Sequence, residues 1–144
     1  MRIMSVDAGR TGQFENFARG LFLLRQALAR GAEALGPLEK EGALRRFEYC
    51  LDLAWKAARE FLEDSGLRIA PVTPRETLRQ AAAAGIVADA QVWIDMFNHR
   101  NLLAHNYDGV VIAEVTKELA ARYLRAMEQL HDSLVAQEQV TSAV

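Results

Sequence analysis

The stretch from residue 98 to residue 108 holds most of the side chains of this chain that could move a proton or bind phosphate. It reads Asn-His-Arg-Asn-Leu-Leu-Ala-His-Asn-Tyr-Asp and includes two of the three histidines. Histidine exchanges protons near neutral pH, and arginine binds phosphate through two nitrogens and stabilises developing charge. Arg100 and His105 are therefore the candidate catalytic residues, and a group with a phosphate is the ligand that they favour.

The segments that must position this stretch are helical, because apolar residues recur at spacings of three and four along nearly the whole chain. Caps and breakers such as Gly36-Pro37, Ser65-Gly66, Thr73-Pro74, Asp89 and Asp108 mark their ends. The expected helices cover residues 13–35, 38–64, 74–84, 90–106 and 110–136. Short connections make successive long helices antiparallel. The predicted fold is all-α, an up-down four-helix bundle with one additional short helix.

Arg100 violates the apolar pattern of its own predicted helix. It falls on the same stripe as Trp93, Met96 and Leu103, which the spacing turns toward the core. A guanidinium on a core-facing stripe needs a partner or a wet cavity, and such violations tend to be functional or strained. Arg100 is thus the first residue at which chemistry is expected.

Polar pairs at a spacing of four identify the solvated faces of the helices. The expected pairs are Glu41–Arg45, Asp52–Lys56, Arg59–Glu63 and Asp95–His99.

Length and composition favour one domain, residues 1–144, with a core at about 13–136 and loose tails at 1–12 and 137–144. No apolar run reaches the roughly 18–20 residues that span a bilayer, and no secretory leader is recognisable. A single cysteine, Cys50, cannot form an internal disulfide, which favours the cytoplasm. No zinc-ligand spacing occurs, so no metal or other cofactor is expected. The net charge of −2 argues against a dedicated nucleic-acid coat, yet permits a local basic groove.

The chain resembles the HEPN superfamily (higher eukaryotes and prokaryotes nucleotide-binding), in particular the branch of nucleotidyltransferase substrate-binding proteins. The signature of that superfamily is an arginine, a polar residue, three further residues and a histidine, which matches Arg100-Asn101-Leu102-Leu103-Ala104-His105. The stretches Arg46–Lys56 and Pro74–Arg79 also resemble the branch. The likeness covers roughly residues 14–130 and follows the order of the predicted helices.

The resemblance implies a helical bundle that forms a homodimer through the motif helix. Many HEPN proteins are metal-independent endoribonucleases, and this branch is typically encoded beside a minimal nucleotidyltransferase, as in toxin–antitoxin pairs. In one group the motif continues to a tyrosine two residues after the histidine, and the partner silences the ribonuclease by transferring AMP to it. Tyr107 stands at that position and is the possible AMPylation site.

RNA cleavage by a 2′-hydroxyl needs a proton acceptor, a proton donor and a positive charge at the phosphorus. Arg100 and His105 lie about 140° apart around an ideal helix. They converge only if the helix ends near Ala104 or if two copies of the chain meet. One histidine is insufficient for both proton transfers, so ribonuclease activity would require a two-fold dimer. Asn101, one turn before His105, is the expected supporting residue that orients the imidazole.

Each motif residue also has a purely structural interpretation. Arg100 could pair with Asp52 or Glu48. His105 could be placed at the end of its helix simply because the helix dipole stabilises a positive charge there. Tyr107 could be a packing residue at a turn. The sequence therefore leaves three functions open. The leading one is a ribonuclease toxin paired with a nucleotidyltransferase. The others are a non-catalytic subunit that binds nucleotide or substrate for that enzyme, and a structural dimerisation protein.

Overall fold

The computed structural model describes the backbone of residues 3–143 and the side chains of residues 12–138, and within these limits it is helical with no strand. The two predicted tails therefore lie largely outside the described side chains. The helices are α1 (Ile3–Leu28), α2 (Pro37–Asp64), α3 (Pro74–Ala83), α4 (Ala90–His105), α5 (Gly109–Glu118) and α6 (Leu124–Ala143). A 3₁₀ turn spans Ala32–Ala34, and a π-helical segment, Leu119–Tyr123, joins α5 to α6.

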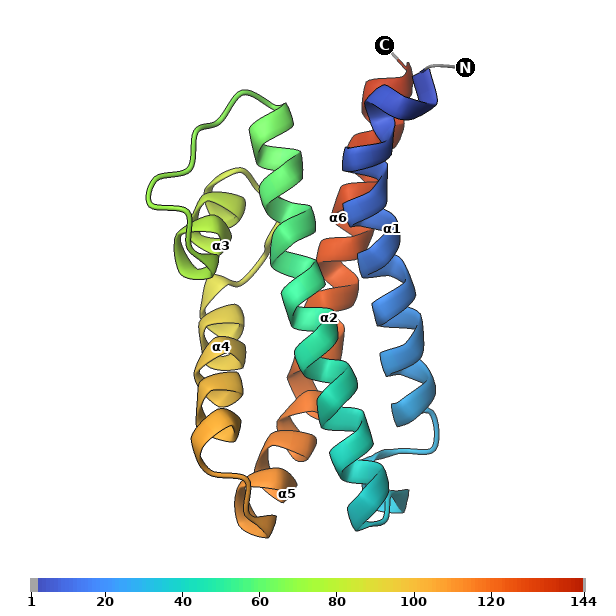
Figure 1. The fold of residues 1–144 in the computed structure, drawn as a ribbon, viewed down its shortest axis with the longest axis vertical. Coiled ribbons are helices and arrows are strands. Elements are labelled where there is room, and N and C mark those ends of the chain that lie inside the picture. Colours follow the sequence, from blue (N-terminus) through green and yellow to red (C-terminus); the bar gives the residue numbers. More distant parts are fainter. Residues whose placement is uncertain (1–2, 144) are drawn as a thin grey trace.

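The predicted up-down bundle with an additional short helix is confirmed. Figure 1 shows that α1 and α2 are antiparallel and that α4 runs opposite to α2. The chain then turns through α5 at the end of the bundle, and α6 runs back and ends beside α1. The short helix α3 lies against α2 and α4. The loop from α4 to α5 therefore lies at one end of the bundle, and it carries the end of the motif.

The capping residues explain why the predicted helix starts agree with the structure. Thr73 accepts a hydrogen bond from the amide of Glu76 at 3.1 Å, and Asp89 accepts one from the amide of Gln91 at 3.0 Å. Gly66 ends α2 with a φ of 97°, which belongs to the left-handed region that glycine enters without strain.

The predicted end of the first helix was wrong. We expected it to run to Leu35, but α1 ends at Leu28, and Gly31 then turns the chain with a φ of 91°. Leu35 is buried all the same, because the 3₁₀ turn brings it back to the core. The apolar stripe thus indicated correctly that Leu35 is buried and incorrectly that it is helical.

The outer ends of the bundle also differ from the sequence expectation. Helix α1 begins at Ile3 and not at Gln13, and α6 continues past Ala136 to Ala143. Neither added segment contains proline, the residue that most strongly stops a helix.

The core joins all four long helices through large buried side chains. Phe17 of α1, Phe47 of α2, Trp93 of α4 and Tyr123 of the π segment have no exposed surface. The rings of Phe47 and Tyr123 stack with their centroids 5.7 Å apart. Cys50 is a core residue, as expected, and burial raises the pKa of its thiol to about 12.

The last predicted helix, 110–136, is interrupted by the π segment, which the sequence interpretation missed. The amide of Leu124 bonds to the carbonyl of Leu119, five residues earlier, which defines the wider turn. The buried residues Val115, Leu119, Tyr123 and Met127 follow one another in steps of four. Each step overshoots one turn of an α-helix by about 40°, so the π turn keeps the stripe facing the core.

Within the part of the chain that the structure describes, none of the helices combines the length and the apolarity needed to cross a bilayer.

Replacing Asp108 by alanine should lower the free energy of unfolding by about 1 kcal/mol, because two amides at the start of α5 lose their acceptor. The Asp108 carboxylate accepts from the amides of Val110 and Val111, both at 3.0 Å. Urea denaturation measures the change. Asp108→Asn is the matched control, since an amide oxygen caps equally well; an equal loss in both variants would contradict the capping role.

Candidate functional site

Helix α4 carries the motif and packs on one side only. Trp93, Met96, Phe97 and Leu103 are its buried residues, and they face α3, α5 and the π segment. The outer face of its second half is exposed and includes Asn98, Asn101, Leu102 and His105. The polar motif is thus presented at the surface by a helix whose inner face is anchored.

The guanidinium of Arg100 is half-buried and has no ion pair among the described side chains. Its Cζ atom lies 5.1 Å from the centre of the Phe97 ring, a cation–π arrangement that holds it against α4. Asp52, one partner expected from the sequence, pairs instead with Lys56 at 3.0 Å. Burial raises the pKa of Glu48, the other expected partner, while Arg45 and Arg100 act in the opposite direction. Glu48 makes no ion pair with Arg100 within 4.0 Å. Arg100 therefore remains able to bind an anion.

His105 is the last residue of α4, and its side chain is exposed. Among the described residues it has no hydrogen-bond partner. Asn101 is exposed as well, and no hydrogen bond joins it to His105 within this chain. The expected orientation of the imidazole by Asn101 is thus not made in the single chain.

One chain by itself does not bring Arg100 and His105 together. Both lie in the helical part of α4, so the five residues between them separate their directions by about 140°. Helix α4 ends at His105, one residue past Ala104, so His105 itself still has a helical register relative to Arg100. A site that uses both residues requires a second copy of α4.

Tyr107 lies in the loop after α4, beside a stripe of charged residues on α2. Its side chain is 48% exposed. Its partial burial, together with the carboxylates of Glu41 and Glu48, raises the pKa of the Tyr107 phenol, while Arg45 acts in the opposite direction. These three residues of α2 share one face at spacings of four and three, so they form one charged edge beside the end of the motif.

This charged edge of α2, which consists of Glu41, Arg45 and Glu48, was not predicted as part of the site. We expected Glu41 and Arg45 to form an ion pair, and the described side chains contain no such pair. The pairs Asp52–Lys56 and Arg59–Glu63 are confirmed, at 3.0 and 3.1 Å. The spacing of Glu41, Arg45 and Glu48 indicated that these residues share one face of α2. Only the fold shows that this face lies beside Tyr107.

The predicted surface pair between His99 and Asp95 was wrong. His99 is mostly buried, and its Nδ1 atom lies 2.7 Å from the hydroxyl of Tyr123. Asp95 pairs with Arg122 at 3.2 Å. Tyr123 and Arg122 both belong to the π segment, which the sequence did not reveal.

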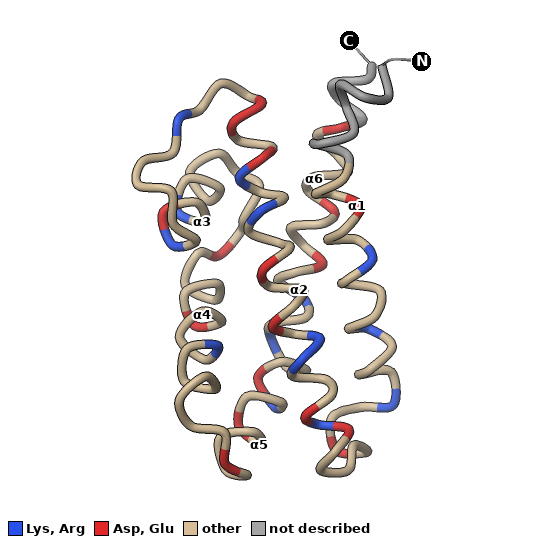
Figure 2. The backbone as a smooth tube through the Cα atoms, viewed as in Figure 1, with Lys and Arg blue, Asp and Glu red and all other residues tan. Residues whose placement is uncertain are grey.

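Figure 2 shows basic and acidic positions interspersed along the trace of α2. Among residues 12–138, no group of three or more histidine, cysteine, aspartate or glutamate side chains is arranged to hold a metal ion.

Comparisons with known proteins place this geometry in a family context. The family model described as "Nucleotidyltransferase substrate binding protein like" matches residues 12–136. A solved protein from Thermus thermophilus is 32% identical with a TM-score of 0.70, over 79% of this chain and 94% of that one. The tri-AMPylated HEPN toxin of Shewanella oneidensis, solved in complex with MNT antitoxin, is 15% identical with a TM-score of 0.70, over 88% and 96% of the two chains. None of the curated proteins compared is significantly similar.

Removing charges from the edge of α2 should move the pKa of Tyr107 in opposite directions. Glu48→Gln should lower it, because a nearby carboxylate disfavours the phenolate. Arg45→Gln should raise it, because a nearby cation favours the phenolate. Titration of the Tyr107 Cζ resonance by ¹³C NMR measures both shifts.

Glu63→Gln is the control for this titration, since Glu63 pairs with Arg59 near the other end of α2. A Tyr107 pKa that does not respond to either Glu48→Gln or Arg45→Gln would show that the charged edge does not face the phenol.

Proposed function

The chain belongs to the nucleotidyltransferase substrate binding protein like family, whose model covers residues 12–136, and from this premise we propose that it works with a nucleotidyltransferase as a HEPN-type ribonuclease. The fold is that of the HEPN superfamily, as the likeness to the Shewanella toxin shows. Arg100 and His105 are the proposed catalytic residues, with RNA as the substrate.

The observation that carries this proposal is the state of Arg100. It sits at a core-facing register and is half-buried, and its guanidinium lies over Phe97 without an ion pair among the described side chains. A partly buried cation without a paired carboxylate favours the binding of an anion. A phosphate group supplies the missing negative charge through paired N–H donors.

In the proposed mechanism two copies of α4 meet, so that two arginines and two histidines share one cleft. One His105 accepts the proton of the 2′-hydroxyl while the 2′-oxygen attacks phosphorus. The bond to the 5′-oxygen breaks, and that oxygen takes a proton from the second His105. The products are a 2′,3′-cyclic phosphate and a free 5′-hydroxyl. Arg100 stabilises the extra negative charge on the phosphorane.

The exposed outer face of α4 supports such a two-fold arrangement. Leu102 is 38% exposed between the polar residues Asn101 and His105. In an isologous contact the same face would meet itself. Asn101 would then support the imidazole of His105 from within the shared cleft.

We further propose that the partner enzyme silences this site by transferring AMP to Tyr107. The phenol oxygen would attack the α-phosphorus of ATP, lose its proton to a base, and release pyrophosphate. The half-exposed position of Tyr107, two residues after His105, supports this role. The added adenylate would place a negative charge and a bulky group beside the cleft, where the RNA phosphate would otherwise bind.

The description of the family favours a second candidate function, a non-catalytic subunit that presents a substrate to the nucleotidyltransferase. Arg100 would then bind the phosphate of a nucleotide, and His105 would have no proton to transfer. Nucleotide binding measured by calorimetry would depend on Arg100 and be unaffected by His105→Ala.

His105→Ala should reduce RNA cleavage by about 10²–10⁴-fold, because general acid–base catalysis by histidine contributes that much. Cleavage of a fluorescent oligoribonucleotide by unmodified protein measures the rate, and excess chelator should leave the wild-type rate unchanged. His131→Asn is the control, since His131 stacks on Phe14 of α1 away from the motif.

Arg100→Gln should reduce the same rate by a comparable factor and raise the KM for RNA. A wild-type protein that is free of AMP and still fails to cleave any RNA, while it binds nucleotide through Arg100, would replace the ribonuclease by the second candidate.

A further inference from the structure

Helix α3 places a second arginine on the outer face of the motif helix. The guanidinium of Arg75, the second residue of α3, donates from Nη2 to the amide oxygen of Asn98 on α4 at 2.5 Å. Both side chains are exposed. An amide oxygen carries no charge, so this contact orients the guanidinium without neutralising it. Among the side chains of residues 12–138, Arg75 has no carboxylate partner within ion-pair distance.

Asn98 and His105 lie on the same face of α4. They are seven residues apart, which brings them to within about 20° of one another around an ideal helix. The rise of the helix separates them by about 10 Å along its axis. Arg75 is thus held on the face of α4 that carries His105, whereas Arg100 lies about 140° away from His105.

The face of α4 between these two positions carries amides and no carboxylate. Asn98, Asn101 and Leu102 are exposed there. An asparagine amide offers both donors and an acceptor, and asparagine and arginine are among the side chains that bind the phosphates and sugars of nucleic acids. This face therefore suits the backbone of a single strand.

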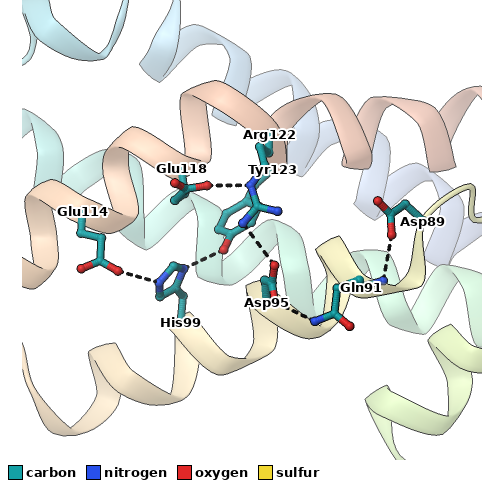
Figure 3. Close-up of polar contacts among 8 residues, drawn as sticks. All are labelled: Asp89, Gln91, Asp95, His99, Glu114, Glu118, Arg122 and Tyr123. Atoms are coloured by element: carbon teal, nitrogen blue, oxygen red, sulfur yellow. Dashed lines mark hydrogen bonds and ion pairs between the residues drawn. The ribbon is translucent and has the colours of Figure 1, made fainter.

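The one acidic residue of α4 and the one acidic residue of α3 are both engaged by neighbouring donors. Figure 3 shows Asp95 of α4 directed toward Arg122 of the π segment, at 3.2 Å. Glu76 of α3 accepts from the side chain of Gln80 at 3.0 Å and lies 3.8 Å from Arg79. These contacts reduce the repulsion that the two carboxylates would exert on a phosphate near Arg75.

We propose that Arg75 binds a phosphate of the RNA away from the bond that is cut, in a subsite about 10 Å along α4 from His105. The inference rests on the proposed function, because it takes RNA as the ligand and His105 as the residue at the cut. A strand with one phosphate per about 3.4 Å, as in a duplex, covers this distance in about three nucleotides.

The two-fold arrangement proposed above leaves this subsite open. The contact between two copies of α4 would be centred on Leu102 and His105, near the end of the helix. Arg75 lies about two helical turns further back, so it would stand at the rim of the shared cleft. Each protomer would supply one such subsite, on its own side of the cleft.

Binding of a 2′-O-methylated oligoribonucleotide tests the subsite without cleavage, because methylation blocks the attacking hydroxyl. Fluorescence anisotropy at a series of salt concentrations gives the Kd and its salt dependence. Arg75→Gln should raise the Kd by about two- to fivefold, as expected for one exposed ionic contact. The slope of log K against log salt should fall in magnitude by about 0.7, the value for one phosphate contact with a single strand.

A lysine variant and a shorter probe make the test specific for a distant phosphate. Arg75→Lys keeps the cation and should retain the wild-type salt slope. A 2′-O-methylated dinucleotide has a single phosphodiester and cannot reach from His105 to Arg75. Its Kd should therefore be the same in Arg75→Gln and in the wild type.

Arg19→Gln is the matched control. Arg19 is likewise an exposed arginine that donates to an asparagine, since its Nη2 atom lies 2.6 Å from the amide oxygen of Asn16. It belongs to α1, which Figure 1 shows on the far side of α2 from α4. The variant removes the same charge and should leave the Kd and the salt slope unchanged.

In cleavage of the unmethylated oligoribonucleotide, Arg75→Gln should raise the KM by a similar factor and leave kcat unchanged. A contact that is equally strong in the ground state and in the transition state affects only binding. A fall in kcat with an unchanged KM would refute the subsite, because Arg75 would then act at the cut itself.

Three further outcomes separate this inference from the proposed function. A wild type that cleaves RNA, with the same Kd and salt slope in Arg75→Gln, would overturn the subsite and leave the ribonuclease standing. A wild type that binds the oligonucleotide without cutting its unmethylated form, with the expected loss in Arg75→Gln, would refute the ribonuclease and keep the subsite. A wild type that binds no oligonucleotide would overturn both.

Discussion

Helix α4 contacts the π segment through one buried hydroxyl, that of Tyr123. Leaving a buried hydroxyl unpaired costs about 1–3 kcal/mol, and His99 is the partner that removes this cost. The same tyrosine stacks on Phe47 of α2, and Arg122 lies over its ring. Through Tyr123, therefore, the π segment holds α2 and α4 at fixed positions, and the turn after α4 follows from them.

The distribution of buried residues along α4 explains how this helix can end in a cluster of polar residues. The first half of α4 is anchored by Trp93, Met96 and Phe97, while the second half has only Leu103 in the core. Exposed residues of the motif, such as Asn101 and His105, then cost little, because water solvates them. The fold thus presents a cation, an imidazole and a phenol at one end of the bundle without disturbing its core.

The membership of the chain in a family of nucleotidyltransferase substrate-binding proteins agrees with this arrangement. A partner enzyme would find Tyr107 half-exposed, next to the charged edge of α2. Among the side chains of residues 12–138, no carboxylate lies within ion-pair distance of Arg100, which leaves it able to bind the phosphate of the proposed RNA substrate. The two proposed functions differ in what they would require of His105, since binding requires a cation alone and cleavage also requires proton transfer.

The sequence by itself determined the helices, most of their caps and the residues whose side chains could take part in chemistry. Local rules suffice for these, because a cap or an apolar stripe involves residues within a turn or two. The same rules failed at the end of α1, where the chain turns at Gly31, and between α5 and α6, where a π segment interrupts the predicted helix. Only the tertiary structure decided that His99 bonds to Tyr123, 24 residues away, and not to Asp95. It also decided that Glu41 and Glu48 lie beside Tyr107. The periodicity of a helix defines its own faces, but the rotation of one helix against another is set by contacts between residues far apart in the chain.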